Sequence, residues 1–363
     1  MPESFDINSS SGSYSVKIEA NALNVLKQSY PTAFYIIDSK LAPHLSINSN
    51  HSLVIDATEE NKSLEAIAQY VIELREKKVH RKTHLIAIGG GVIQDIATFL
   101  ASIYMRGLKW TYLPTTLLGM VDSCIGGKSS INVSGYKNLV GNFYPPGEIA
   151  IDLGFTATLD EEAIVAGLCE AAKICYAYSE DVFDSYLSGI SSNRELRGNV
   201  TESLVFQSLM SKKWFIEIDE FDQKERLLLN FGHTFGHALE GASNYGISHG
   251  IGVGIGMLVA IQYSKNHQLL DPKGLMAIGR LSTHIEDLLA NIKNLQSVIK
   301  QLNIDEIMKK FESDKKHLAD QYRVVVPTGS GRLELQLIEK STQSQLNIVN
   351  AFNQAFERIT TSN

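Results

Sequence analysis

The sequence has little cysteine, no excess of basic residues and no long uninterrupted hydrophobic run. Its cysteines, Cys124, Cys169 and Cys175, are odd in number and lack CxxC spacing, which argues against a disulfide framework or a cysteine zinc site. The net charge of −7 argues against a nucleic-acid surface, which would need a clustered basic face. No apolar stretch reaches the ~20 residues of a membrane span, and no segment resembles a signal peptide. We therefore expect a cytoplasmic protein that binds neither nucleic acid nor a membrane.

What the first part of the sequence does contain is an alternation of short β-branched runs and amphipathic segments. Residues 33–38, 52–56 and 84–88 are predicted strands, and 64–74 and 96–104 are predicted helices. This rhythm is typical of βαβ units and predicts a parallel sheet.

The second part changes character beyond about Leu159, where long amphipathic stretches have helical periodicity. The predicted helices span 161–178, 199–217, 232–243, 250–267 and 274–289. A late hairpin is predicted over 322–327 and 332–336, joined by a Thr-Gly-Ser-Gly turn. The 363 residues therefore predict two domains, an α/β domain over 1–160 and a helical domain over 161–363.

The turn from Gly89 to Asp95 follows the predicted strand 84–88 and opens the next helix. Glycines let main-chain amides approach an anion closely, and a helix start adds partial positive charge. The turn is not a GxGxxG fingerprint, and a glycine run after a strand is often only a tight turn. The residues alone leave nucleotide binding and a plain turn both open.

A dense polar stretch runs from Arg106 to Tyr144 and includes Lys128 directly after two glycines. Lysines, an arginine and paired glycines suit a phosphorylated, anionic substrate, and the guanidinium of Arg106 offers a planar fork to phosphate or carboxylate. The alternative is a surface loop with solvated lysines, which the glycines next to Lys128 disfavour.

Glu170 and Lys173 lie one helical turn apart, so they share a face of the predicted helix 161–178. An exposed salt bridge, worth only ~0.3 to ~0.5 kcal/mol, is one interpretation. The small and apolar neighbours favour a buried carboxylate instead. Such a carboxylate needs a cation, and a metal ion would serve.

His233, His237 and His249 lie close together in the sequence among glycines. Catalytic zinc-type centres take three ligands from histidine and acidic side chains and leave a position open. A lone histidine on an apolar helix is as often a hydrogen-bonded core residue, but three of them favour a metal. Spacing alone pairs His233 with His237, yet Thr234 stands where the HExxH motif has glutamate, so a metalloprotease is disfavoured.

Arg226 and Asn230 precede the histidines and lie four residues apart. A helix that ran on into the histidine segment would present both side chains together toward the metal.

These motifs occur in a fixed order: GGGVxxD, MRG, PTTLL, DSxxGGK, KN, FYxP, ExxK, LNFGHTFGHA and a later HG. From about Tyr35 to Val326 the chain thereby resembles the 3-dehydroquinate synthase family of sugar-phosphate cyclases. The resemblance implies a Rossmann-like NAD-binding α/β domain and an all-α metal-binding domain. It also implies NAD and a divalent metal, Zn or Co, as cofactors, and a homodimer.

The implied activity is that of a carbon-oxygen lyase of the shikimate pathway, which leads to chorismate and the aromatic amino acids. The substrate would be a phosphorylated sugar acid, 3-deoxy-D-arabino-heptulosonate 7-phosphate, and the products 3-dehydroquinate and phosphate. Transient oxidation by NAD, phosphate elimination, re-reduction and an aldol closure would make the ring.

The resemblance also implies roles for particular residues. It makes Glu170, His233 and His249 the metal ligands, and it leaves His237 beside the metal or on the phosphate side. The implied NAD-binding residues are Asp38, Glu59, Lys62, Gly90, Gly91, Val92, Ile93, Asp95, Thr115, Thr116, Asp122, Lys128, Lys137, Phe155, Thr156, Ala157 and Thr158. The implied catalytic and substrate-binding residues are Lys128, Asn138, Lys173, Lys212, Arg226, Asn230, His237 and Lys316, with Arg106 reaching into a partner subunit.

The chain departs from the family pattern at a few positions. Ile251 replaces a glutamate after the last His-Gly, and we expect this to weaken the orientation of His249. Gln94 replaces a glycine in the GGGVxGD motif. Arg226 and Asn230 are both present, which favours a carboxylated substrate. Three alternatives stay open: a divergent cyclase with another substrate, a glycerol-type polyol dehydrogenase, and an inactive binding protein.

Overall fold

The computed structural model describes residues 3–134, 136–190, 195–244 and 246–361, and the chain divides into two compact units. The first unit runs to Leu159 and also contains Val200–Glu220, whereas the second contains Asp160–Asn199 and Phe221–Asn363. Sequence periodicity assigns the helix of residues 199–217 to the helical domain, but the structure groups it with the first unit. The reason is tertiary packing, since this helix contacts the first strand and residues 119–123. Among the described helices, none is both long and apolar enough to span a membrane.

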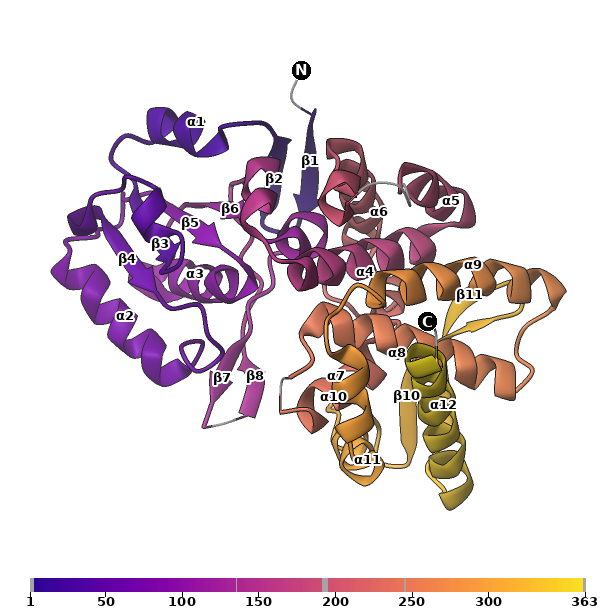
Figure 1. Cartoon of the computed structure of the whole chain (residues 1–363). Helices are drawn as coiled ribbons and strands as arrows, with labels where there is room; N and C mark the ends of the chain where they lie inside the picture. The colour runs from indigo at the N-terminus through magenta and orange to yellow at the C-terminus, as the bar shows by residue number, and fades with distance from the viewer. Residues whose placement is uncertain (1–2, 135, 191–194, 245, 362–363) are drawn as a thin grey trace. The chain divides into compact units, whose positions relative to one another are not determined.

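The first unit contains a seven-stranded sheet in the order β1-β2-β9-β6-β5-β3-β4 (Figure 1). β1 and β2 are antiparallel, and every other neighbouring pair is parallel, as predicted. The order β4-β3-β5-β6-β9 is doubly wound, and such sheets bind ligands where the chain reverses direction, here between the carboxyl ends of β3 and β5. The strands are β1 (Glu3–Ser9), β2 (Gly12–Ile18), β3 (Phe34–Asp38), β4 (Ser52–Ile55), β5 (Leu85–Gly89), β6 (Trp110–Pro114) and β9 (Glu148–Ile151).

Helices cover this sheet because its central strands are apolar on both faces, as parallel strands usually are. All residues of β5 are buried; Ile86 and Ile88 pack toward Ala22 and Leu26 of α1, while α3 contacts β3, β5 and β6. The helices are α1 (Ala22–Ser29), α2 (Leu64–Glu76), α3 (Gly91–Ile103) and α6 (Glu202–Ile218), and a small hairpin joins β7 (Ile131–Val133) to β8 (Tyr136–Val140).

The second unit is helical with one hairpin, as predicted. Helix α8 contacts α4, α7, α9, α12 and β10 (Figure 1), and it is buried around nearly its whole circumference because it is apolar all round. The elements are α4 (Glu161–Tyr178), α5 (Glu180–Gly189), α7 (His233–Ala242), α8 (His249–Asn266), α9 (Pro272–Leu289), α10 (Leu295–Gln301), α11 (Ile304–Glu312), β10 (Gln321–Thr328), β11 (Arg332–Glu339) and α12 (Thr342–Thr361).

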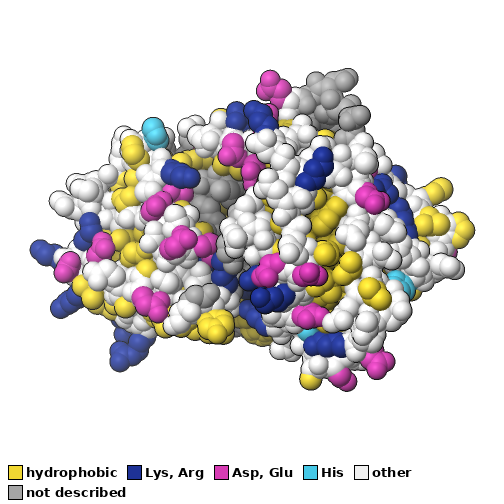
Figure 2. Space-filling view, turned by 60° about the horizontal axis from the view of Figure 1, so that its bottom comes forward, with side chains coloured by type: hydrophobic (Ala, Val, Ile, Leu, Met, Phe, Trp, Pro, Cys, Tyr) yellow, Lys and Arg dark blue, Asp and Glu magenta, His cyan; other side chains and the backbone are white. Residues whose placement is uncertain are grey.

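Charged side chains of both signs are visible on the face drawn in Figure 2. Acidic and basic residues lie among one another there, with hydrophobic side chains between them. On the described part of this face, neither sign gathers to the exclusion of the other.

Candidate metal centre and anion-binding residues

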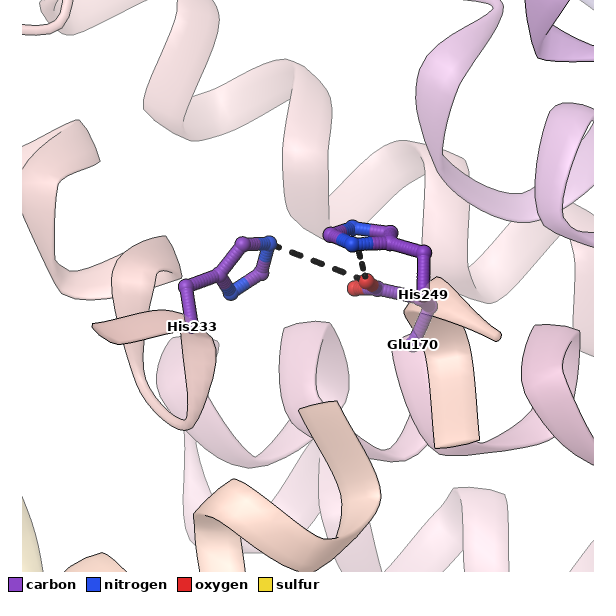
Figure 3. A group of neighbouring side chains, drawn as sticks. All are labelled: Glu170, His233 and His249. Carbon is purple, nitrogen blue, oxygen red and sulfur yellow. Dashed lines mark ion pairs between the residues drawn. The ribbon is translucent and has the colours of Figure 1, made fainter. Parts of the chain in front are cut away.

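Glu170, His233 and His249 converge in the second unit from three different helices, α4, α7 and α8 (Figure 3). Oε1 of Glu170 lies 3.7 Å from Nε2 of His233 and 3.4 Å from Nε2 of His249. One ligand atom from each residue lies within 4.8 Å of the other two. Two imidazoles and a carboxylate at these separations suit a divalent cation of the zinc type.

Glycines bring the three helices close enough for this convergence. A Cβ on Gly250 would lie 2.4 Å from the carbonyl oxygen of Ala166, so α8 lies directly against α4. A Cβ on Gly256 would lie 2.0 Å from the carbonyl oxygen of Gly232, so α7 and α8 are equally close. Side chains at these glycines would push the ligand-bearing helices apart.

The carboxylate of Glu170 is fully buried, and its neighbour Lys173 is 2% exposed. The two form an ion pair, so the alternative of an exposed helix salt bridge is wrong. Among the described residues, neither oxygen of Glu170 has a hydrogen-bond partner of normal geometry. Lys173 offsets the burial cost at Oε2, whereas Oε1 faces the two histidines, where a bound cation would complete its pairing.

His233 presents a neutral nitrogen to Glu170. Its Nδ1 lies 3.3 Å from the carbonyl oxygen of Phe231, so Nδ1 carries the proton and Nε2 offers its lone pair. Burial, together with the positive charge of Lys173, lowers the pKa of His233 well below 6.5. His233 is therefore in the form that a metal ion requires.

His249 lies between two carboxylates. Its Nδ1 is 2.9 Å from Oε1 of Glu240, and its Nε2 faces Glu170. Burial lowers the pKa of His249, but Glu170 and Glu240 outweigh burial and raise it to about 10. A cation at Nε2 would have to displace a proton, because a ligating imidazole is neutral.

In a second set, His237, Glu240 and His249, one possible ligand atom from each residue also lies within 4.8 Å of the other two. Oε1 of Glu240 is already at hydrogen-bond distance from His249, whereas the oxygens of Glu170 have no hydrogen-bond partner of normal geometry among the described residues. The set containing Glu170 therefore fits a cation better.

His237 lies beside the predicted ligands but faces another partner. Its Nδ1 is 3.6 Å from Oδ2 of Asp314, and its side chain is 40% exposed. Burial raises the pKa of Asp314, but His237 and Lys316 outweigh burial and lower it to about 2. Asp314 also accepts the backbone N–H of Lys316, whose Nζ donates to Oδ1 of Asn230 at 2.8 Å. These residues form one connected polar group.

The predicted continuous helix from Arg226 into the histidine segment is wrong. Residues Glu225–Asn230 form a 3₁₀ helix, and the chain then turns at Gly232, whose φ of 79° is left-handed. A 3₁₀ helix has three residues per turn, so a spacing of four does not align Arg226 with Asn230. Arg226 is 4% exposed, and Nδ2 of Asn230 donates to the carbonyl of Leu227.

In the first unit, Lys62 is the centre of a second charged group. Its Nζ lies 3.0 Å from Asp95, 3.4 Å from Glu59 and 3.1 Å from Oδ1 of Asn138. Lys137 also lies 3.7 Å from Glu59. Four residues predicted to bind NAD therefore lie in one group with Asn138, which is predicted to bind the substrate.

The carboxyl ends of the parallel strands hold the other predicted NAD residues. Asp38 ends β3, and Gly90 and Gly91 link β5 to α3, where a Cβ on Gly90 would lie 2.9 Å from Cγ2 of Thr116. The amides at the start of α3 are available to an anion. Ile93 is fully buried, so it could offer only its backbone. Val92 lies in the first turn of α3, Thr115 follows β6, and Phe155, Thr156, Ala157 and Thr158 lie in the 3₁₀ helix Leu153–Thr158 after β9.

Lys128 and Lys212 both belong to the first unit. Nζ of Lys128 lies 5.8 Å from the ring centre of Phe143. Lys212, on α6, pairs with Asp122 at 2.5 Å and donates to the carbonyl of Ile125. Arg106 is exposed and has a left-handed φ of 68°, directly after Met105 with a φ of 49°.

Sequence reasoning missed Glu240, Asp314 and Asn132. Glu240 lies seven residues after His233, a helical spacing that signals a shared face. Asn132, which donates to Glu59 at 3.0 Å, and Asp314 give no such signal, because their partners are distant in sequence.

The doubly wound unit and the helical unit with its Glu-His-His set define a fold class that sugar-phosphate cyclases share with some dehydrogenases. A structure of 2-deoxy-scyllo-inosose synthase complexed with carbaglucose-6-phosphate, NAD+ and Co2+ has a TM-score of 0.80 at 21% identity, covering 97% of this chain and 99% of that one. A probable glycerol dehydrogenase from Sinorhizobium meliloti has a TM-score of 0.58 at 12% identity, covering 96% and 98%. At these identities both likenesses concern the fold alone.

Sequence comparison gives the family. The 3-dehydroquinate synthase N-terminal family matches residues 52–166, and its C-terminal family matches 167–317. A 3-dehydroquinate synthase of Dictyoglomus turgidum is 32% identical over 80% of each chain. One from Saccharolobus solfataricus is 40% identical over 50% of this chain and 51% of its own. The chain belongs to the 3-dehydroquinate synthase family.

A further solved structure of this fold is named for another product. The 2-epi-5-epi-valiolone synthase ValA of Streptomyces hygroscopicus, with NAD+ and Zn2+ bound, is 26% identical with a TM-score of 0.78, covering 95% of this chain and 97% of that one. Synthases named for different products therefore share the architecture, and the substrate has to be argued from the site.

Proposed function

We propose that this chain is a 3-dehydroquinate synthase, which converts 3-deoxy-D-arabino-heptulosonate 7-phosphate into 3-dehydroquinate and phosphate. One observation carries the proposal: the buried carboxylate of Glu170, without a hydrogen-bond partner of normal geometry among the described residues, faces two imidazoles. Together with membership of the family, this cation site favours a metal-dependent cyclase over an inactive binding protein.

The residues present fit both cofactors that solved cyclases of this fold contain, NAD+ and Co2+ or Zn2+. Glu170, His233 and His249 would hold the metal, and the turn at Gly90 and Gly91 would hold the NAD pyrophosphate. When bound, the metal polarises a substrate hydroxyl and NAD accepts and later returns a hydride, so neither is consumed.

Cationic side chains in the second unit would bind the anionic substrate. Lys173 and Lys316 both lie close enough to His233 for their charges to lower its pKa. Lys316 is held by Asn230, and the buried guanidinium of Arg226 can make a bidentate contact with a carboxylate. The first unit adds Lys128, Asn138 and Lys212 to the proposed set.

His237 would move or hold a proton on the phosphate side. The carboxylate of Asp314, whose Oδ2 lies 3.6 Å from Nδ1, stays ionised because its pKa is about 2, so its charge would stabilise a protonated ring. An imidazole held by a carboxylate in this way suits general acid or base work.

We also propose a homodimer in which Arg106 serves the partner's site. Arg106 is exposed, and both it and the preceding Met105 have a left-handed backbone conformation. This conformation costs energy and often marks a functional position. Co-expression of Arg106→Ala with His233→Ala should restore part of the activity that each variant lacks alone. Mixed dimers that stay as inactive as the single variants would contradict the shared site.

The activity is tested by the stoichiometry of NAD. With NAD far below the substrate concentration, the purified protein should convert the heptulosonate phosphate completely, releasing one phosphate per molecule without accumulating NADH. A glycerol-type dehydrogenase would instead reduce all of the added NAD to NADH and then stop, with most of the substrate unconverted. Complete reduction of the NAD, or no phosphate release, would reject the proposal.

The substrate class is tested by Arg226→Ala. This change should raise KM for the heptulosonate phosphate about 100-fold, since a charged hydrogen-bond pair is lost, and leave KM for NAD almost unchanged. Arg280→Ala, on an exposed pair with Glu180, is the matched control. Equal changes in both KM values, or none, would favour a cyclase whose substrate lacks a carboxylate.

A further inference from the structure

Glu240 has no part in the residue assignments above, yet its Oε1 lies at hydrogen-bond distance, 2.9 Å, from Nδ1 of the predicted metal ligand His249. We propose that Glu240 is a positioning residue that fixes the imidazole of His249 for metal binding. The inference rests on the proposed metal centre and adds a residue to it. It also explains how the chain does without an acidic side chain at position 251.

The geometry assigns a different carboxylate to each nitrogen of the His249 ring. Oε1 of Glu240 lies 2.9 Å from Nδ1, while Oε1 of Glu170 lies 3.4 Å from Nε2. A carboxylate at Nδ1 keeps the proton on that nitrogen and turns the lone pair of Nε2 toward the metal. Glu240 thereby sets both the tautomer and the rotation of the ring.

The sequence places Glu240 there through helix geometry and through one glycine. Glu240 lies two turns after His233 on α7, so both side chains are on the same face. A Cβ on Gly252 of α8 would lie 3.3 Å from Cγ and 3.5 Å from Oε1 of Glu240. Because Gly252 has no side chain, the carboxylate has room to reach across to His249.

Ile251 cannot orient the ring. Its side chain is 1% exposed in the apolar interior around α8 and offers no hydrogen-bond acceptor. The sequence predicts that Ile251 weakens the orientation of His249, but the contact from Glu240 of the neighbouring helix α7 compensates for the missing acidic side chain. Orientation comes from α7 rather than from the residue two positions along α8.

Two other roles of Glu240 have to be separated from positioning. Glu240 could merely tether α7 to α8, in which case metal affinity would not depend on it. It could instead be a direct ligand together with His237 and His249, the second set that meets the distance criterion. Metal affinity of matched variants distinguishes all three roles.

The experiment measures the zinc dissociation constant of the full chain by chelator competition, without substrate or NAD. We expect Glu240→Ala to weaken zinc binding about 10- to 100-fold and Glu240→Gln to weaken it less, because the amide oxygen can still accept from Nδ1. Both variants should also shift the visible absorption of the Co2+-substituted protein. The control is Glu286→Gln on α9, which removes a carboxylate paired with Arg358 of α12 and should change zinc affinity less than about two-fold.

Several outcomes would overturn the inference. If both Glu240 variants bind zinc within two-fold of the unchanged chain and keep a normal cobalt spectrum, Glu240 only tethers α7 to α8. Loss of zinc in His237→Ala together with retention in His233→Ala would make Glu240 a ligand. Glu240→Gln keeps the side-chain volume, so it remains informative if Glu240→Ala unfolds. Zinc affinity is measured without turnover, so it tests the role of Glu240 separately from the proposed function. If the Glu240 variants lose zinc affinity but the unchanged chain releases no phosphate, the proposed function is rejected and the role of Glu240 stands.

Discussion

Each of the two units buries a cluster of charges, and the clusters differ in how completely their members are paired. In the α/β unit, Lys62 meets Asp95, Glu59 and Asn138 at 3.0 to 3.4 Å, so its charge is balanced. In the helical unit, Glu170 forms an ion pair with Lys173, but its buried Oε1 faces the imidazoles of His233 and His249 and has no hydrogen-bond partner among the described residues. A paired cluster holds loops in place, whereas an underpaired carboxylate beside two imidazoles is suited to a cation.

In each cluster the pKa of one group is raised, but the physical cause differs. Burial raises the pKa of Asp95 to about 6, although the positive charge of Lys62 acts against this shift. His249 has its pKa raised to about 10 by carboxylates that outweigh burial. Both clusters thus hold a group whose pKa is raised, by burial in the first unit and by two neighbouring carboxylates in the second.

The largest expected effect comes from breaking the underpaired cluster. His233→Ala should remove the metal and lower turnover at least about 10³-fold, because metal polarisation is worth several kcal/mol. Metal content and phosphate release measure the two effects. His267→Ala, directly after α8 with its ring tilted against that of Tyr263, should change neither. A His233→Ala protein that keeps full metal content would mean that the cation site is elsewhere.

Breaking the paired cluster should affect stability first. Lys62→Met leaves Asp95 without its main counter-ion and should lower the free energy of unfolding by about 3 kcal/mol, measured by denaturant titration. Lys137→Met removes the more exposed 3.7 Å pair with Glu59 and should cost less than about 1 kcal/mol. Equal losses from the two variants would show that Lys62 is not the centre of the cluster.

A smaller effect distinguishes a satisfied histidine from the metal-binding ones. His284 of α9 is buried against the hydroxyl of Tyr186 at 2.9 Å, and burial lowers its pKa from 6.5 to about 4. At a pH between about 4 and 6.5, His284 is protonated in the unfolded chain but neutral in the folded chain, so the free energy of unfolding falls as pH falls. We expect a loss of about 2 kcal/mol from pH 7 to pH 5. His284→Gln should flatten this part of the pH profile, and an unchanged slope would assign the acid sensitivity to other groups.

Local sequence patterns predict those elements whose periodicity is strong. The range of α4 and the late hairpin agree with prediction, because amphipathic spacing and a glycine turn determine them. Helix α3 begins at Gly91 rather than at Ile96, since glycines conceal the first turn from a pattern based on apolar residues. The membership of α6 in the first unit depends on tertiary contacts that its own sequence does not encode.

The candidate site was predictable where residues share a motif and not where distant segments meet. Glu170, His233 and His249 come together as the family resemblance implies. The break at Gly232 depends on its packing against α8, so the four-residue spacing of Arg226 and Asn230 was misleading. Asp314 is joined to His237 only by the packing of α11 against α7, which no local pattern reveals.

The central claim is that Glu170, His233 and His249 hold a metal on which dehydroquinate formation depends. The most direct measurement is phosphate release from 3-deoxy-D-arabino-heptulosonate 7-phosphate, with catalytic NAD, before and after treatment of the purified protein with a chelator. We predict that release stops on chelation and returns when Zn2+ or Co2+ is restored to one ion per chain. Phosphate release that continues unchanged in the fully metal-depleted protein would contradict the account.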